Sequence, residues 1–343
     1  MLYSNKSLIL ITTLFLLTIV SCSDDDPSLL DNNPNIVNGV DTTIISPEFN
    51  FTEHFVSVLQ SQIHYVDEVG SGSEIFLLLH GQPTSAYLWR NVIPHLKTKG
   101  RVIAPDLIGM GKSGKPNIDY TFSDHIDYIN AFIAELNLED IILVIHDWGS
   151  SIGFNYAATF PEKVKGIVFM EALIAPTSIN EVPADFAQIL QVSFNGEEGD
   201  TTQGTGWRFN VIDNQFIETI LPSSILRPLT EEEMNNYRAP FLNISDRKPV
   251  WQFPRQVPIT EFGAPDNIAI VGNYFQALQT NEVPKLFLYA EPGVLMNAET
   301  GMFMQSIFPA LSVESIGAGL HFIQEDQPHN IGIAINKWVD LNF

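Results

Sequence analysis

From residue 74 onward, the chain repeats a pattern in which a short apolar run ends at small or polar residues. The first run, Glu74–Leu79, stops at His80 and Gly81. Continuous apolar runs of this length are typical of strands that are buried on both faces of a sheet. Similar runs recur at residues 101–105, 141–145, 165–170 and 285–289.

Helical periodicity separates these runs. In residues 122–136 the apolar positions recur every three or four residues, from Ile126 to Leu136. Ahead of the first run, residues 55–58 and 62–66 alternate as the two strands of a hairpin. Strand and helix therefore alternate, which predicts an α/β fold with a mostly parallel central sheet and helices on both faces.

The alternation stops between residues 172 and 263, where helical patterns, prolines and polar residues are more frequent. We interpret this segment as a helical cap inserted over the sheet, with the core formed by residues 48–171 and 264–343. Inside the cap, residues 195–206 are rich in glycine and polar residues, and we expect a flexible loop there.

The composition is strongly acidic. The chain has 40 Asp and Glu residues and 17 Lys and Arg residues, which gives a formal net charge of −23. Such a charge repels phosphate backbones, so we expect no nucleic acid partner. The hydrophobic content of 45% supports a sizeable core.

The first 21 residues have the pattern of a signal peptide. Lys6 precedes an apolar stretch from Ser7 to Val20, which is too short to span a bilayer comfortably. The stretch ends in Ile-Val-Ser-Cys at residues 19–22, which resembles a bacterial lipoprotein cleavage site. We therefore expect lipidation of Cys22. The alternative is an ordinary signal peptide with a cysteine nearby by chance.

Cys22 is the single cysteine, so the chain has no internal disulfide and no partner for a cysteine-based metal site. Residues 22–47 are predicted to form an acidic, flexible tether. It begins with Ser-Asp-Asp-Asp at residues 23–26, which resembles an export signal of some surface lipoproteins; the alternative is a solvated spacer. These features predict a protein anchored to the outer membrane only through its lipid and exposed at the surface, with a periplasmic location as the alternative.

The main chemical signal lies at residues 145–150, Ile-His-Asp-Trp-Gly-Ser, between a buried strand and a helical pattern. A sharp strand-to-helix turn at this place exposes the nucleophile in one large class of hydrolytic enzymes. Asp147 stands where a serine is usual, and Gly149 permits the turn. The alternative is an aspartate that only caps the helix.

An aspartate nucleophile suits displacement at saturated carbon. A serine attacking such a carbon would form an ether, which water does not readily cleave. A carboxylate forms an ester instead, and an activated water can hydrolyse it to regenerate the enzyme. Alkyl halides and epoxides are the candidate electrophiles.

Five motifs resemble those of haloalkane dehalogenases, a family of the α/β-hydrolase superfamily. They are HGQPTS at residues 80–85, YLWR at 87–90, PDLIGMG at 105–111, HDWGS at 146–150 and GLHFIQED at 319–326. The similarity extends from residue 51 to the C-terminus and includes cap residues 225–229 and 253–259. It is greatest to the subfamily whose catalytic acid follows the sixth strand.

The resemblance implies a catalytic triad. Asp147 would be the nucleophile, His321 the general base, and Glu171 the acid that orients His321. Glu291, which also follows a predicted core strand, is the rival for the acid.

The resemblance also implies two halide donors, the indole N–H of Trp148 and the side-chain amide of Gln82. The family usually has asparagine in place of Gln82, and the extra methylene must be absorbed by the site. The backbone N–H groups of Gln82 and Trp148 would form the oxyanion hole for ester hydrolysis.

An apolar pocket lined by Phe216, Phe253, Pro254 and Leu295 is expected by resemblance, although each could be ordinary core. Phe253 replaces a tryptophan that is common in relatives. The implied partners are a small halogenated aliphatic substrate, water and the halide product, with no cofactor and no metal.

Three other functions use the same scaffold. An epoxide hydrolase would normally bring two cap tyrosines, whereas the cap segment contains only Tyr237. A luciferase-like oxygenase shares the triad, so the triad does not discriminate against it. A non-catalytic surface binding protein would be expected to have lost part of the triad.

Overall fold

The structure, a computed structural model, describes residues 36–343. The predicted signal peptide, Cys22 and the first part of the predicted tether lie outside the described residues. Within residues 36–343, no helix is long and apolar enough to cross a membrane.

An eight-stranded sheet forms the centre of the molecule, in the order β10-β9-β8-β7-β5-β6-β4-β3. Its strands are β3 (Glu53–Val58), β4 (Ser61–Glu68), β5 (Glu74–Leu79), β6 (Gly100–Pro105), β7 (Ile141–Asp147), β8 (Val164–Ala172), β9 (Lys285–Pro292) and β10 (Leu311–Gly319). Strand β4 is antiparallel to both β3 and β6, and the other neighbouring pairs are parallel. Every predicted apolar run lies in one of these strands, so the prediction of a mostly parallel sheet is confirmed.

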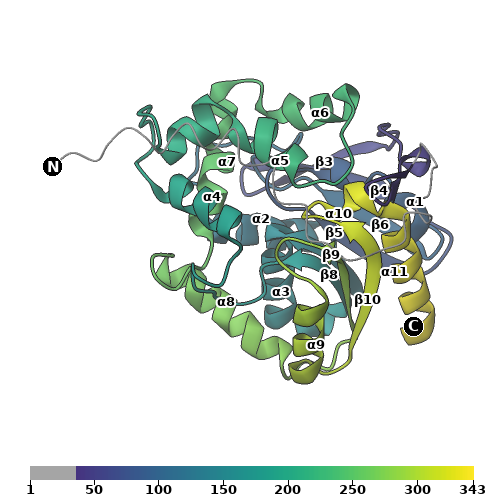
Figure 1. Ribbon diagram of the computed structural model, residues 1–343. Helices are drawn as coiled ribbons and strands as arrows, with labels where there is room; N and C mark the ends of the chain where they lie inside the picture. The colour runs from purple at the N-terminus through teal and green to yellow at the C-terminus, as the bar shows by residue number, and fades with distance from the viewer. Residues whose placement is uncertain (1–35) are drawn as a thin grey trace, which may run out of the picture.

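Helices cover both faces of the sheet (Figure 1). The core helices are α1 (Ile93–Leu96), α2 (Phe122–Glu135), α3 (Trp148–Thr159), α8 (Pro265–Leu278), α9 (Ala298–Ile307), α10 (Ile323–Asp326) and α11 (Pro328–Asn342), with single 3-10 turns η3 (Ala86–Trp89) and η4 (Pro161–Lys163). Helix α2 occupies the segment predicted from its periodicity, and Thr121 and Asp124 form a capping box at its start.

Alternate side chains of each central strand enter two different hydrophobic clusters. In β5, Leu77 and Leu79 pack in the cluster that includes α2, α3 and α8. Phe76 and Leu78 pack in the cluster that includes α1 and α11. Because both faces are buried, these strands are apolar at nearly every position, which explains why the sequence alone locates them.

Within the central sheet, β10 is the strand that the hydrophobic pattern does not predict. It lies at one edge of the sheet, and most of its residues are partly or fully exposed. An edge strand with this exposure needs no continuous apolar run, so Leu311–Gly319 carries no strong sequence signal.

Short helices between β8 and α8 form the cap, which Figure 1 shows over one end of the sheet. They are α4 (Ala184–Phe194), η5 (Arg208–Ile212), η6 (Phe216–Ile220), α5 (Leu221–Ser223), α6 (Glu231–Arg238), η7 (Ala239–Phe241), η8 (Ile244–Arg247), α7 (Lys248–Gln252) and η9 (Phe253–Gln256), of which η5 and η6 are π-helical. Leu221 and Met234 of the cap pack with Tyr87 and Phe322 of the core in a third cluster. Residues 195–205 form turns and bends with no regular helix or strand.

The predicted tether boundary at residue 47 is wrong, because residues 36–47 pack on the folded domain. They form a hairpin of β1 (Ile36–Val37) and β2 (Val40–Asp41), followed by the turn η2 (Thr42–Ile44). The Asn38 side chain donates to the carbonyl of Leu226 in the cap, at 2.8 Å. The Ser46 carbonyl accepts from Nε of Arg90, also at 2.8 Å. The acidic, polar composition had suggested solvation, whereas these polar groups bind the domain.

The packing of residues 36–47 on the domain predicts a stability effect at Val40, which is fully buried. Val40→Ala should lower the free energy of unfolding by about 1–3 kcal/mol, because apolar contacts are lost. Val69→Ala is the matched control, because Val69 is 79% exposed and should tolerate the change. Chemical denaturation of both variants measures the difference, and equal stabilities would show that the N-terminal hairpin does not contribute to the fold.

Candidate active site

Asp147 lies on a strained turn between β7 and α3. Its backbone has φ of +49° and ψ of −128°, a conformation that costs a non-glycine residue about 1–3 kcal/mol. Two glycines make the turn possible. A Cβ on Gly149 would lie 2.2 Å from the Leu79 carbonyl oxygen, and one on Gly81 would lie 2.0 Å from Oδ1 of Asp147. The fold thus presents the carboxylate of Asp147 at the carboxyl end of the central strands.

The carboxylate of Asp147 is buried and hydrogen-bonded. Its Oδ1 accepts from the backbone N–H of Gln82 at 2.7 Å. Burial alone would raise the pKa of Asp147, but His321 and the backbone N–H of Trp148 outweigh that effect and hold the pKa below its ordinary value. Asp147 is therefore ionised near neutral pH, as a nucleophilic carboxylate must be.

His321 lies between two carboxylates. Its Nε2 is 3.5 Å from Oδ2 of Asp147, and its Nδ1 is 3.0 Å from Oε2 of Glu171. Burial alone would lower the pKa of His321, but hydrogen bonds and charges from Asp147 and Glu171 raise it to about 9. His146 contacts the carbonyl oxygen of His321 through Nε2 at 2.9 Å and so supports the backbone of His321.

Glu171 lies near the end of β8, the sixth strand of the sheet along the chain. Its carboxylate accepts three backbone N–H groups from the loop after β9, those of Val294 (3.1 Å), Leu295 (2.8 Å) and Met296 (3.2 Å). These donors fix the carboxylate that contacts His321. The sequence did not predict them, because a backbone donor requires no particular side chain.

Glu291, the rival acid, does not contact His321 in the structure. Glu291 is exposed, and its carboxylate accepts from the backbone N–H of Ala298 at 3.4 Å. Of the two glutamates, Glu171 is the one at hydrogen-bond distance from His321.

An aromatic stack holds the indole of Trp148. Its ring lies 5.0 Å from that of Phe253, which stacks in turn on His125 at 3.9 Å. Phe122 contacts the indole from another side at 5.2 Å. Phe253 is fully buried in this stack and does not line the cavity, so the prediction that it is a lining residue is wrong. Its aromatic ring supports Trp148 instead.

Gln82 joins the core to the cap. Its backbone N–H binds Asp147, while its side-chain Nε2 donates to the carbonyl of Val250 in α7 at 2.7 Å. The extra methylene of glutamine, relative to asparagine, is absorbed by this contact with the cap. An amide nitrogen carries two hydrogens, so one donor of Gln82 is not used by Val250.

Asp147, Trp148, Gln82 and His321 all line one cavity of about 500 Å³ beneath the cap. The cavity wall is mainly apolar. Its apolar residues are Leu173, Pro183, Phe186, Ile189, Leu190, Phe216, Ile220, Pro254, Val257, Val294, Leu295, Leu320 and Phe322. The structure therefore places Phe216, Pro254 and Leu295 where the sequence predicted them. Among residues 36–343, no group of three or more His, Cys, Asp or Glu side chains is arranged to hold a metal ion.

The chain is similar to a broad fold family and, within it, to one family of enzymes. A family described as alpha/beta hydrolase fold matches residues 74–328. The chain is 40% identical to a haloalkane dehalogenase of Mesorhizobium japonicum over 285 residues, which cover 83% of this chain and 90% of that protein. It is 41% identical to a haloalkane dehalogenase of Sphingobium indicum over 292 residues, which cover 83% and 94%. The chain belongs to the haloalkane dehalogenase family.

Solved structures agree with this assignment. The haloalkane dehalogenase DbeA from Bradyrhizobium elkani superposes with a TM-score of 0.78 at 36% identity, covering 85% of this chain and 98% of that one. The haloalkane dehalogenase DatA from Agrobacterium tumefaciens gives a TM-score of 0.77 at 31% identity, with 85% and 97% covered. The α/β-hydrolase fold predicted from the sequence is confirmed.

The contacts of His321 predict how its pKa responds to substitution. In the wild type its imidazole should titrate near pH 9. Glu171→Gln should lower this midpoint, because it removes one of the two carboxylates, and should reduce turnover by about 10²- to 10⁴-fold. Glu291→Gln, the matched control, should change neither. NMR titration of the imidazole measures the midpoint, and equal effects of the two substitutions would contradict the assignment of Glu171.

Proposed function

We propose that this chain is a haloalkane dehalogenase that hydrolyses a carbon–halogen bond to an alcohol, a halide and a proton. The observation that carries the proposal is the carboxylate of Asp147 on its strained turn, with one oxygen fixed by Gln82 and the other near His321. This carboxylate faces an apolar cavity, where it can meet a saturated carbon.

In the first step, Oδ2 of Asp147 attacks the carbon that bears the halogen. A carbon–oxygen bond forms, the carbon–halogen bond breaks, and the halide leaves with the bonding electrons. The indole N–H of Trp148 and the second amide hydrogen of Gln82 are the proposed donors to the departing halide. The product is an alkyl ester of Asp147.

In the second step, His321 removes a proton from water, and the resulting hydroxide adds to Cγ of Asp147. The backbone N–H groups of Gln82 and Trp148 stabilise the charge on Oδ1. The bond between Cγ and the alkyl oxygen then breaks, and the alkoxide takes the proton from His321. The carboxyl group of Asp147 loses its proton, which accounts for the acid released in each cycle.

The cavity favours small neutral substrates. Among residues 36–343, the wall contains one ionisable residue besides Asp147 and His321, the exposed Asp185 of α4, and no Lys or Arg. Together with the net charge of −23, this carboxylate opposes the entry of anionic substrates such as halogenated carboxylates.

The structure gives no support to an epoxide hydrolase, which would need tyrosines that reach the epoxide oxygen. Tyr237 is buried, and its hydroxyl donates to Glu325 rather than lining the cavity. A non-catalytic binding protein has no need of the contacts that join Asp147, His321 and Glu171.

Steady-state halide release from 1-bromobutane and 1,2-dibromoethane tests the proposal. The wild type should release halide, and Asp147→Asn should reduce the rate by at least about 10⁴-fold, because the nucleophile is lost. Asp127→Asn, at an exposed position of α2, is the control and should retain full activity. Turnover of styrene oxide without halide release from any haloalkane would overturn the assignment.

We also propose that the chain is exported and anchored to the outer membrane through a lipid on Cys22. The support is the sequence pattern of Lys6, the apolar residues 7–20 and the cysteine that follows Ser21. In a Gram-negative host, the wild type should incorporate labelled palmitate and sediment with outer membranes. Cys22→Ala should do neither, whereas Ser28→Ala should behave as the wild type. A wild type without label would contradict the anchor.

A second experiment distinguishes a surface location from a periplasmic one. Protease added to intact cells should cleave the protein if it is exposed at the surface, and should leave it intact if it is periplasmic.

A further inference from the structure

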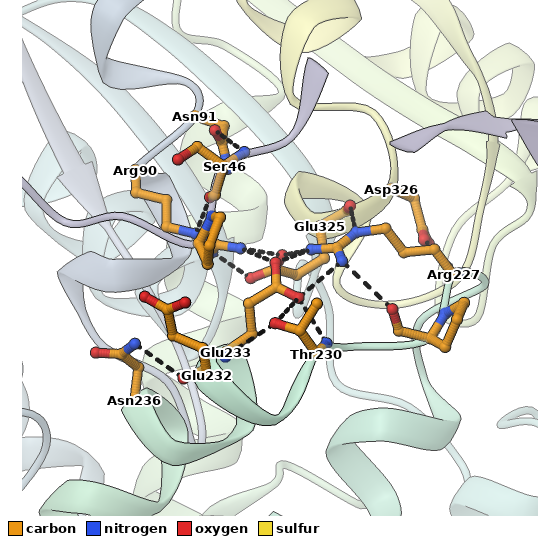
Figure 2. Close-up of polar contacts among 12 residues, drawn as sticks. Ser46, Arg90, Asn91, Arg227, Thr230, Glu232, Glu233, Asn236, Glu325 and Asp326 are labelled. Atoms are coloured by element: carbon orange, nitrogen blue, oxygen red, sulfur yellow. Dashed lines mark hydrogen bonds and ion pairs between the residues drawn. The ribbon is translucent and has the colours of Figure 1, made fainter. Parts of the chain in front are cut away.

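Five buried charged side chains join the cap to the core at a place outside the cavity. We call this group, Arg90, Arg227, Glu233, Glu325 and Asp326, the cap–core cluster. Each of its members is at most 4% exposed, and none lines the cavity. Figure 2 shows the charged ends of Arg90 and Glu325 from the core and of Arg227 and Glu233 from the cap pointing toward one another.

Within the cluster, two arginines balance two glutamates. Arg90 makes a bidentate contact with Glu325, at 2.5 and 2.8 Å, and a further contact with Glu233 at 2.8 Å. Arg227 contacts the same two carboxylates, at 2.5 and 2.7 Å. Because each charge is buried and paired, removing one of them would leave a partner uncompensated and destabilise the whole fold. These four residues hold the cap on the core.

Asp326 differs from the other four, because all its contacts are with backbone N–H groups. Its Oδ1 accepts from Leu226 at 3.0 Å and Arg227 at 3.2 Å, both in the cap. Its Oδ2 accepts from Leu320 at 3.2 Å, the residue immediately before His321, and from Leu226 at 3.1 Å. One carboxylate therefore connects the cap backbone to the loop that carries the general base.

A second contact ties the same loop to the cap. The backbone N–H groups of His321 and Phe322 both donate to the carbonyl of Ser224, at 3.1 and 3.2 Å. The cap thus holds the backbone of His321, while Glu171 holds its imidazole ring through Nδ1.

We propose that Asp326 is a positioning residue, which holds His321 at the distance needed for ester hydrolysis by linking its loop to the cap. This inference rests on the proposed dehalogenase function. Attack by Asp147 on the substrate does not require His321 as a base, whereas hydrolysis of the ester does. A shift of about 1 Å in a catalytic group can cost about 10²-fold in rate. Loss of the link should therefore slow hydrolysis and leave formation of the alkyl ester nearly unchanged.

Asp326→Asn tests the link with little change of shape. An amide has one acceptor oxygen, so the asparagine can accept either from the cap N–H groups or from the N–H of Leu320. On the opposite side its NH₂ group then faces a backbone N–H, and two donors do not bond to each other. Either orientation of the amide breaks the connection. Glu232→Gln is the matched control, because Glu232 is exposed beside Glu233 and its carboxylate lies outside the cluster (Figure 2).

The experiment is rapid-quench kinetics with 1-bromobutane, which measures bromide release and, by intact mass, the alkylated enzyme. For Asp326→Asn, the rate constant for alkylation should stay within about twofold of the wild type, while that for hydrolysis falls at least tenfold, so that alkyl-enzyme accumulates. Glu232→Gln should change neither. Asp326→Glu keeps both acceptor oxygens and should hydrolyse the ester faster than the asparagine variant.

Unchanged rate constants in Asp326→Asn, or a proportional fall in both steps, would overturn the positioning role. If that variant does not fold, Asp326→Ser, which also lacks a second acceptor oxygen, replaces it with the same expected outcome. A wild type that releases no bromide and forms no alkyl-enzyme would overturn the proposed function itself, so the two failures are distinguishable.

Discussion

The geometry of the active site depends on the hydrogen bond between the backbone N–H of Gln82 and Oδ1 of Asp147. This bond fixes one carboxylate oxygen, and the other, Oδ2, lies 3.5 Å from Nε2 of His321. It requires the strained backbone of Asp147 and the absence of a side chain at Gly81, whose Cβ would collide with the carboxylate. The strain persists because β5, β7 and α3 pack in the core on both sides of the turn and hold its ends in place.

The remaining functional groups follow from the parallel sheet. The carboxyl ends of parallel strands meet at one edge, so residues far apart in the sequence converge there. β5 leads to Gln82, β7 ends at Asp147, β8 carries Glu171, and β10 leads to His321. The cap covers this edge and forms a mainly apolar cavity, in which charge interactions are stronger than in bulk water.

The charge balance of the site suits a two-step reaction. In the resting enzyme His321 lies between two carboxylates, which raise its pKa to about 9. Formation of the ester neutralises Asp147 and removes one of the charges that stabilise the protonated imidazole. The pKa of His321 must then fall, so the same side chain becomes a better acceptor for the proton of water at the step that needs a base.

How much the sequence predicts depends on whether each feature has a local cause. The central strands were predictable because both of their faces are buried, and Asp147 was predictable because its strand-to-helix turn is contiguous in the chain. Strand β10 was not, because an edge strand can be polar.

The features that the sequence left open arise from tertiary contacts. Glu171 and Glu291 both lie near the ends of core strands, and the resemblance favours Glu171, but the loop that donates to Glu171 is visible only in the structure. The burial of Phe253 behind Trp148 and the bond from Gln82 to Val250 likewise depend on where the cap sits. Residues 36–47 have the polar composition of a tether, because the groups that hold them on the domain are polar and bind distant parts of the chain.

The most direct test of the central claim is to follow oxygen-18 from labelled water into Asp147. After repeated turnover of 1-bromobutane, mass spectrometry of the peptide that contains residue 147 should show heavy oxygen in its carboxyl group, because water attacks Cγ rather than the alkyl carbon. The label should be absent without substrate. Turnover that leaves Asp147 unlabelled would contradict the ester intermediate and the role of this carboxylate as the nucleophile.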